Sequence, residues 1–588
     1  RQASGNAIAS GAYQLLLMRS SRFLLIALVL STLRPFQLRA SDPPPREYSL
    51  DLWDWTAPCR DLATFTTWAA DLKQVGVTRI EISAPWNLLE PEPGKHDLSF
   101  IADRLAIAKS HGLGMRVRLN AYYHATPGWL AADRWRDAAG NPPVGTPTPV
   151  SINDPRFWDR FGPLLTAIGS RFKGDDILYS PFIGVHAELK YADWWTYDPA
   201  SLALWRETIR SRPAWLLDVV GDAPLPDVPP VPQDTNGTPD NTPPSKAFIA
   251  FREQNWRDAM ARFNAAIKAG DPQAKTSAPL GESFRRESAK FSNLDYFGLS
   301  RGASQVVHSY DFYWHPKDDA WMAAASVAAF RGITGLPVAF EFDGPALTEQ
   351  LKYTEPQLVE LADAALAQGA GIKLANFSYD PRLPSAWPMV RKYADRIASA
   401  TPPLDVARDG RAGEPREKTV LLFVSKWANY CYREKSEWLH DAQFGAWHML
   451  TSRGFPVRII CEDNLDEDLT GYSAMYVAFS PYELMPTSAR RKLERFEQQI
   501  PMIIETKATP ERRPEPNRFQ ATITQAGGRL VLFGEPMAYH WLRSDARERY
   551  NQRLDDALKR IGLPREESPP GSTSAHPTKA TGRATSSR

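Results

Sequence analysis

The sequence predicts an α/β protein in which a (β/α)8 TIM barrel is followed by a smaller, flavodoxin-like α/β domain. Two observations lead to this prediction. Strand-length runs that are apolar or alternating recur eight times within residues 48–379, and helical sequence separates most of them. After a polar break at 401–417, a second series of apolar runs begins. The 588 residues suffice for several domains, and a 43% hydrophobic content is typical of a globular protein.

The eight barrel strands are expected where the short apolar or alternating runs lie, at 48–55, 77–86, 114–122, 177–188, 274–280, 304–313, 336–343 and 371–379. Helical segments between them are expected at 61–74, 99–111, 156–172, 249–268, 319–331 and 355–368. An open doubly wound sheet is the alternative. It seldom needs eight such units in a row, so the sequence favours the closed barrel.

The chain divides into four parts on this interpretation. Residues 1–40 form a leader, 41–400 the barrel, 418–565 the smaller domain and 566–588 a disordered tail rich in Ser, Thr, Pro and Gly. Within the barrel, 221–246 carries eight prolines and no periodicity. This segment is expected to be too polar to pack and to form an extended excursion of the loop after the fourth strand.

The smaller domain shows short apolar runs of the kind that buried strands have. Strands are expected at 418–424, 456–460, 474–479, 501–505 and 529–533, with helices at 437–452 and 487–498. Cys461 lies in Ile459–Asp463 without the flanking glycines of a nucleophile elbow, so an amidotransferase-like activity is excluded. A role in assembly, as in a homo-oligomer, is the more plausible one.

Three cysteines cannot form a disulfide scaffold or a four-ligand zinc site. In an exported protein, Cys431 and Cys461 could pair and leave Cys59 over. Three unpaired, mostly buried thiols are an equally good interpretation.

The leader resembles a secretory signal peptide. Met18 is followed by Arg19 and Arg22, then by the apolar run 23–30 and a polar stretch that ends at Ala40. A charged start, a short apolar core and a small-residue cleavage site predict export to the periplasm or the outside of the cell. The apolar run is too short to span a membrane, and no other stretch is long and apolar enough.

The charge balance argues against nucleic acid as a partner, because Lys+Arg 70 against Asp+Glu 68 leaves no basic excess for phosphate binding. The 19 tryptophans offer flat faces on which sugar rings can stack. Packing in a large fold is an equally good account of so many tryptophans.

Barrel enzymes place their chemistry at the carboxyl ends of the strands. The carboxylates expected there are Asp54, Glu188, Glu282, Asp311, Glu341, Asp343 and Asp380, with Glu81 further inside. Glycoside hydrolysis needs two such groups. Glu188 follows an apolar strand and precedes several aromatic residues, and the apolar neighbours of Glu341 are expected to desolvate it. A helix cap or a salt bridge is the alternative for any one of them.

Two stretches carry a resemblance to a known family. Residues 76–97, with Trp86, Glu90-Pro91 and Asp97, resemble the second barrel repeat of clan A glycosidases, and of glycoside hydrolase family 42 in particular, which comprises mostly β-galactosidases. Ala125–Leu130 resembles that family's Ala-Thr-Pro-Pro-Trp-Leu turn. The smaller domain is similar to the β-galactosidase trimerisation domain.

This resemblance implies a retaining β-glycosidase that acts on a carbohydrate substrate. Glu188 is then the acid/base and Glu341 the nucleophile, with no metal and no organic cofactor, and the protein could form a homotrimer. At the end of the sixth strand, either Tyr310 or Tyr313 is expected to donate a hydrogen bond to the nucleophile. Packing in an aromatic core layer is an equally good account of either tyrosine.

Other residues near loop ends are candidates for sugar contacts. They are Trp53, Trp86, Asn120, His124, His186, Trp194 and Trp387. For the tryptophans, packing in the core is the alternative interpretation.

The sequence departs from the family at two informative places. Ala187 stands before Glu188, where clan A enzymes nearly always have an Asn that holds the sugar 2-hydroxyl, and no Trp follows Glu341 within 342–345. A β-mannosidase, a β-glucosidase, an endo-glycanase or a carbohydrate-binding barrel without turnover therefore remain alternatives to a β-galactosidase.

Overall fold

The structure is a computed structural model of the 588-residue chain. It describes residues 46–563, with gaps at 54–55, 144–147, 186–187, 192, 233–238, 282–294, 310–319, 344–353, 376–382, 401–415, 433–436, 506–521, 526–529 and 544–546. The predicted signal peptide and tail lie outside these residues. No helix in the described part of the chain has the length and apolar character needed to cross a membrane. Residues Glu47–Arg588 form one compact unit.

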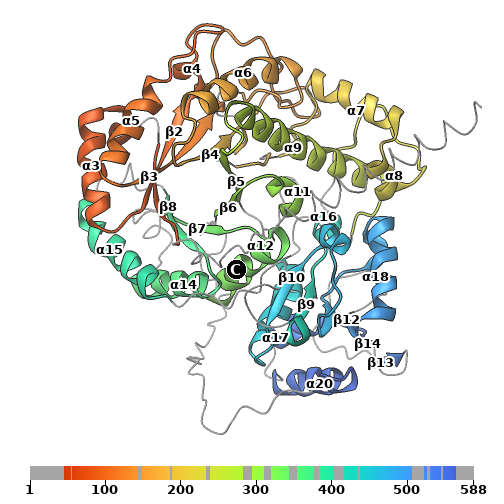
Figure 1. Ribbon diagram of the computed structural model, residues 1–588. Coiled ribbons are helices and arrows are strands. Elements are labelled where there is room, and N and C mark those ends of the chain that lie inside the picture. Colours follow the sequence, from red (N-terminus) through yellow and green to blue (C-terminus); the bar gives the residue numbers. More distant parts are fainter. Residues whose placement is uncertain are drawn as a thin grey trace, which may run out of the picture. The chain divides into compact units, whose positions relative to one another are not determined.

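Eight parallel strands close into a barrel in chain order, which confirms the predicted fold (Figure 1). They are β1 Tyr48–Leu52, β2 Arg79–Pro85, β3 Gly114–Asn120, β4 Ile177–Phe182, β5 Lys275–Gly281, β6 Gln305–Ser309, β7 Val338–Asp343 and β8 Gly371–Ala375. Every strand overlaps the run in which it was expected.

Helices surround this barrel (Figure 1). They are α2 Ala57–Arg60, α3 Leu62–Gln74, α4 Trp86–Leu89, α5 Ser99–Ser110, α6 Pro155–Arg171, α7 Pro199–Ser211, α8 Ala214–Val220, α9 Pro243–Gly270, α11 Tyr296–Ser300, α12 Ala320–Thr334, α14 Glu355–Ala367 and α15 Leu383–Ser399. Helices α6, α7 and α9 start at a proline, whose missing N–H costs nothing in the first turn.

The strands alternate in polarity, and this alternation divides the barrel wall into two faces. In β1, Leu50 and Leu52 belong to the hydrophobic core, while Asp51 between them bonds an arginine of β3. In β3, Val117 belongs to the same core and Arg116 and Arg118 bond carboxylates of other strands. The apolar side chains therefore face the helices, and the polar ones face the barrel interior.

The segment between β4 and β5 packs more closely than its composition suggests. The carbonyl of Pro226 accepts a hydrogen bond from the Trp205 indole at 3.0 Å, and the carbonyl of Pro230 accepts one from the Tyr197 hydroxyl at 2.8 Å. Pro229 is buried. The prediction that 221–246 is too polar to pack is therefore wrong at these contacts, because proline offers both an apolar ring and a free carbonyl, while most of the described residues of 221–232 are exposed.

The second domain is a six-stranded sheet in the order β10-β9-β11-β12-β14-β13. Its strands are β9 Val420–Phe423, β10 Val457–Ile460, β11 Ala474–Val477, β12 Met502–Glu505, β13 Thr522–Gln525 and β14 Leu530–Phe533. Its helices are α16 Lys426–Tyr432, α17 Glu437–Thr451, α18 Thr487–Gln499, α19 Met537–Arg543 and α20 Arg547–Arg560. The order of the parallel strands is that of flavodoxin-like folds, as predicted. The antiparallel edge strand β13 was not predicted.

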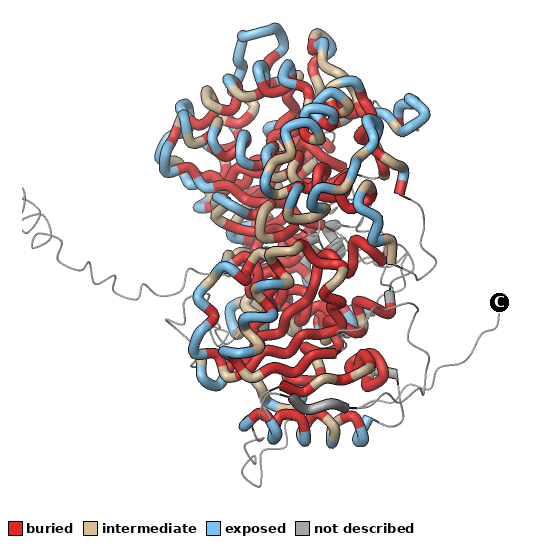
Figure 2. Tube along the Cα trace, turned by 90° about the vertical axis from the view of Figure 1, so that its right-hand side faces the viewer, coloured by how far each residue is buried: buried red, intermediate tan, exposed pale blue. Residues whose placement is uncertain are grey.

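The sheet packs against the barrel through α12 and β10. The two backbones approach so closely that a Cβ on Gly332 would lie 2.3 Å from the carbonyl oxygen of Ile459. Arg458 donates a hydrogen bond from Nε to the Gly332 carbonyl at 3.2 Å. In this way α12 covers β10, which would otherwise be an open sheet edge. Figure 2 shows that the strands of both domains are buried along most of their length.

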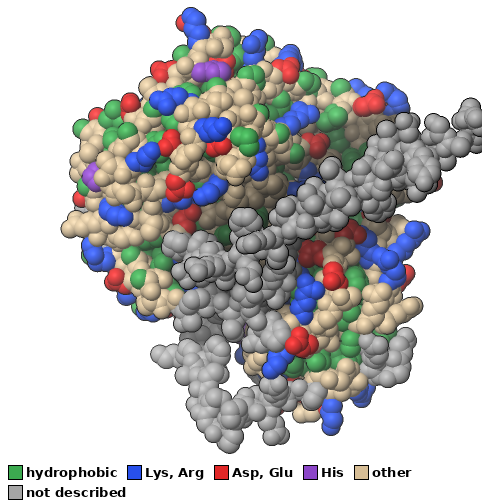
Figure 3. Space-filling view, in the orientation of Figure 1, with side chains coloured by type: hydrophobic (Ala, Val, Ile, Leu, Met, Phe, Trp, Pro, Cys, Tyr) green, Lys and Arg blue, Asp and Glu red, His purple; other side chains and the backbone are tan. Residues whose placement is uncertain are grey.

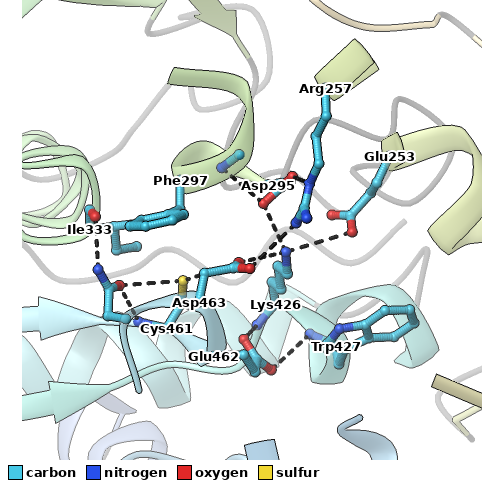
Figure 4. Close-up of polar contacts among 12 residues, drawn as sticks. Glu253, Arg257, Asp295, Phe297, Ile333, Lys426, Trp427, Cys461, Glu462 and Asp463 are labelled. Carbon is cyan, nitrogen blue, oxygen red and sulfur yellow. Dashed lines mark hydrogen bonds and ion pairs between the residues drawn. The ribbon is translucent and has the colours of Figure 1, made fainter. Parts of the chain in front are cut away.

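A buried ionic cluster also joins the two domains (Figure 4). Lys426, at the start of α16, lies 2.8 Å from Asp295, 2.7 Å from Asp463 and 3.6 Å from Glu253. Arg257 of α9 pairs with the same Asp295 and lies 3.4 Å from Asp463. Two cations thus hold three carboxylates that come from the barrel and from the end of β10.

The three cysteines, Cys59, Cys431 and Cys461, are separate buried thiols. Of the two interpretations of the cysteines, the structure therefore has the unpaired one.

Candidate active site

Glu341 lies on β7 and faces the barrel interior, where Oε2 forms an ion pair with the ammonium of Lys373 on β8. Its side chain is 17% exposed. The flanking Phe340 and Phe342 point the other way, and their rings contact His308 and Tyr393. The expectation that apolar strand neighbours desolvate Glu341 is therefore wrong, because successive residues of a strand face opposite sides.

Lys373 connects Glu341 to an ionic network inside the barrel. Its Nζ lies 3.1 Å from Glu81 Oε1, and that carboxylate also receives Arg118 Nε and Arg116 Nη1, each at 2.7 Å. Burial alone would raise the pKa of Glu81, but the three cations hold it well below its usual range. Glu81 is thus a permanent anion beneath the site.

The next carboxylate in the network is Asp51 of β1. Arg118 Nη2 contacts its Oδ2 at 3.0 Å. Burial raises the pKa of Asp51 to about 6, although Arg118 and Lys373 oppose the rise. Arg118 also lies 4.1 Å from the ring centre of Trp53, so one arginine links a predicted sugar-binding tryptophan to the network around Glu341.

Glu188 lies just after β4 and is 6% exposed. Its Oε2 lies 2.5 Å from Lys190 Nζ. The carboxylate sits on the backbone of Gly281 at the end of β5, where a Cβ would lie 1.8 Å from Glu188 Oε1. A side chain at Gly281 would collide with the Glu188 carboxylate, whereas the backbone conformation of Gly281 is one that other residues can adopt.

The register of the sheet relates Glu188 to Glu341. Gly281 pairs with Ser309 of β6, and Ser309 pairs with Glu341. Because neighbouring strands are about 4.8 Å apart, the Cα atoms of Gly281 and Glu341 are separated by about 10 Å across β6. The structure therefore brings both predicted glutamates to the carboxyl-terminal mouth, on either side of β6.

Two further predicted residues lie after β3. Asn120 is buried, with Nδ2 3.3 Å from Ser83 Oγ and Oδ1 accepting the Tyr122 N–H at 3.0 Å. Its amide therefore shapes the turn after β3. His124 is exposed, and its carbonyl accepts a hydrogen bond from Asn87.

The remaining predicted tryptophans are mostly enclosed by protein. Trp86 is fully buried, packs against Trp129 and Phe161, and donates its indole N–H to Glu90 at 2.8 Å. Trp194 is 8% exposed, with the Arg252 guanidinium 4.6 Å from its ring centre. We therefore assign both to packing rather than to an open sugar subsite.

Some predicted residues lie outside the described part of the chain. These are His186, Tyr310, Tyr313 and the strand-end candidates Asp54, Glu282, Asp311 and Asp380. Trp387 lies in α15 and Asp343 ends β7, but their side chains are not described.

The structure adds Lys190, Arg118 and Lys373 to the site, none of which sequence reasoning singled out. A signal for two of them existed. Arg118 and Lys373 each interrupt an apolar strand, and a charge at an alternating position must face the polar side of the wall. On the surface, acidic and basic side chains are interspersed over the face drawn in Figure 3.

Sequence comparisons found no matching protein-family model and no matching curated protein. Solved structures do match. The β-galactosidase from the psychrophilic Marinomonas ef1 aligns with a TM-score of 0.60 and 10% identity over 89% of this chain and 93% of that chain. The β-galactosidase from Bacillus circulans sp. alkalophilus aligns with a TM-score of 0.59 and 13% identity over 79% and 71%.

A GH42 β-galactosidase from G. stearothermophilus, solved as a catalytic mutant, aligns with a TM-score of 0.56 and 11% identity over 79% of this chain and 72% of that chain. At such identities the similarity concerns the fold. The chain therefore shares the fold of these β-galactosidases over most of its length, as a TIM barrel followed by a smaller α/β domain.

Proposed function

We propose that this protein is a retaining glycoside hydrolase that cleaves β-linked sugars, with Glu341 as the nucleophile and Glu188 as the acid/base. The observation that supports the proposal is that Glu341 lies on β7 while Glu188 packs against Gly281 at the end of β5, so that β6 lies between them. A retaining mechanism needs its two carboxyl groups about 5–5.5 Å apart. Side chains that converge from these backbone positions can meet that requirement.

The reaction proceeds in two displacements. In the first, the bond from the anomeric carbon to the leaving oxygen breaks, a bond to a Glu341 oxygen forms, and the Glu188 proton passes to the leaving oxygen. In the second, water attacks the anomeric carbon, its proton passes to Glu188, and Glu341 departs as a carboxylate. Arg118, which belongs to the same ionic network as Glu341, lies 4.1 Å from the ring centre of Trp53, and Trp53 is the residue we propose as a sugar contact.

The substrate proposed first is a β-galactoside, on the basis of the sequence motifs and the shared fold. β-Mannosides, β-glucosides and longer β-linked chains are the further candidates. The test is turnover of a panel of aryl β-glycosides by the protein from residue 41, with NMR of the first anomer formed. Glu341→Ala should lose turnover by about a thousandfold or more, because it removes the group that forms the covalent intermediate.

Glu188→Ala should behave differently from Glu341→Ala. It should retain turnover of dinitrophenyl glycosides, because their leaving group departs without a proton. Added azide should attack the covalent intermediate in place of water, which would restore the second step and give a β-glycosyl azide as the product. Glu355→Ala, an exposed position on α14, is the matched control. Full activity in Glu341→Ala, or an inverted product, would contradict the proposed mechanism.

One observation favours a second candidate, a carbohydrate-binding barrel without turnover. Both glutamates already have a lysine partner, since Glu188 pairs with Lys190 and Glu341 with Lys373. Paired carboxylates are also what a purely structural barrel would contain. Binding of β-linked oligosaccharides with no hydrolysis of any of them would favour this candidate.

A further inference from the structure

Lys373 is buried at the centre of the barrel, 3% exposed, on the strand next to that of Glu341. Sheet register pairs Lys373 directly with Glu341, so the two side chains leave the wall side by side. The ammonium contacts Glu341 Oε2 on one side and lies 3.1 Å from Glu81 Oε1 on the other. One cation is thus shared between a permanent structural anion and the proposed nucleophile.

The other charges inside the barrel show what this cation balances. Ion pairs connect the carboxylates of Glu47, Asp51, Glu81 and Glu341 with Arg79, Arg116, Arg118 and Lys373. Arg79 also lies 3.4 Å from Asp176, outside this group. Removal of Lys373 would take one positive charge from among these buried carboxylates.

Burial would lower the pKa of Lys373, but Glu341 and Glu81 raise it above its ordinary value. The ammonium therefore stays charged throughout the range in which a glycosidase works. For Asp51, the neighbouring cations do not outweigh the effect of burial, which raises the pKa of that carboxyl to about 6.

We infer that Lys373 is the positioning residue of the nucleophile: it holds the Glu341 carboxylate aimed into the barrel mouth through a bridge anchored on Glu81. The inference rests on the proposed function for its catalytic meaning. Lys373 does not touch the reacting carbon. It acts through Glu341, which must be an anion before it attacks and becomes an anion again when water releases the sugar.

The experiment follows the titration of Glu341 itself. Protein with 13C-labelled Glu carboxyl groups is titrated by NMR, and the Glu341 signal is assigned by its loss in Glu341→Gln. In Lys373→Met, the Glu341 midpoint should rise by about one pH unit or more, because an adjacent cation commonly has an effect of that size. Lys373→Arg keeps the charge and should titrate close to the wild type.

Turnover gives the second readout. The acidic limb of the kcat/KM profile should move to higher pH in Lys373→Met by the same amount as the NMR midpoint, and kcat should fall more than KM changes. A merely structural lysine would lower stability without moving that limb. Lys392→Met, which breaks an exposed pair with Glu355, is the control and should change neither readout.

Two outcomes would overturn the inference: an unchanged Glu341 midpoint in folded Lys373→Met, or a Lys373→Arg profile shifted as far as that of Lys373→Met. If Lys373→Met does not fold, the double variant Lys373→Met/Glu81→Gln takes its place, because it removes one anion with one cation. Absence of turnover in the wild type would contradict the proposed function but not the role of Lys373, because the NMR titration tests that role without turnover.

Discussion

The carboxylate of Glu188 lies against Gly281 at the end of β5, so closely that a Cβ there would be 1.8 Å from Oε1 unless Glu188 moved. This contact positions a residue of the loop after β4 against the neighbouring strand. It also explains a glycine at a place where no positive φ is required, since Gly281 is not among the residues with left-handed backbone. The fit makes the position of the proposed acid/base, Glu188, sensitive to a single methyl group at Gly281.

Gly281→Ala should therefore displace Glu188 with little loss of fold. A Cβ at 1.8 Å from Oε1 forces the carboxyl group to move by an ångström or more. A shift of that size can lower kcat/KM by about a hundredfold. Kinetics with a dinitrophenyl glycoside, which needs no proton, should show a smaller loss than kinetics with a poor leaving group. Gly162→Ala, which meets no atom within 4 Å, is the matched control.

Equal losses with both leaving groups in Gly281→Ala would contradict this prediction. They would mean that the methyl group disturbs the barrel mouth as a whole rather than the proton donor.

Lys426→Met should weaken the contact between the two domains. It removes a buried cation that lies within 4 Å of Asp295, Asp463 and Glu253. Leaving buried carboxylates without their partner costs about 3–5 kcal/mol of unfolding free energy. Guanidinium unfolding measures the loss. Lys392→Met removes an exposed lysine instead and should cost at most about 1 kcal/mol. Similar losses in the two variants would show that the cluster contributes little.

Glu505 makes stability depend on pH. This fully buried carboxyl accepts hydrogen bonds from Tyr476 Oη at 2.6 Å, Phe479 N at 2.9 Å and Ala538 N at 3.2 Å. Burial nevertheless raises its pKa to about 7. The folded state thus holds the proton more tightly than the unfolded chain. The stabilisation is complete below about pH 4.3, the unfolded value, and is lost as the pH rises through about 7.

Between about pH 4 and 8, the wild type should therefore lose roughly 3 kcal/mol of unfolding free energy relative to Glu505→Gln, at about 1.4 kcal/mol for each unit between the two pKa values. Urea unfolding at a series of pH values measures the difference. Glu417→Gln, at an exposed position, should follow the wild type. A constant difference between wild type and Glu505→Gln across this range would contradict the assignment.

The prediction of secondary structure from sequence worked where local chemistry decides it. In β1 and β3, one apolar side chain in two packs against helices, so the alternation itself marks the strand. Strand β13, Thr522–Gln525, was missed because an edge strand that pairs antiparallel with β14 needs no apolar run. The proline-rich segment was misjudged because its hydrogen bonds come from Trp205 and Tyr197, which the local sequence does not reveal.

The sequence by itself determined the barrel, the following α/β domain and the position of Glu341 near the end of β7, because each depends on periodicity and on short motifs. The sequence expected Glu188 to end its strand, whereas β4 ends at Phe182 and Glu188 lies in the loop that follows. Only the tertiary structure decided the partners of these glutamates. Lys373 meets Glu341 through the pairing of β7 with β8, and Glu188 meets Gly281 across β4 and β5. Arg118 reaches Asp51 and Glu81 because the barrel brings three strands around one interior. Such contacts join residues far apart in the chain, so no local pattern encodes them.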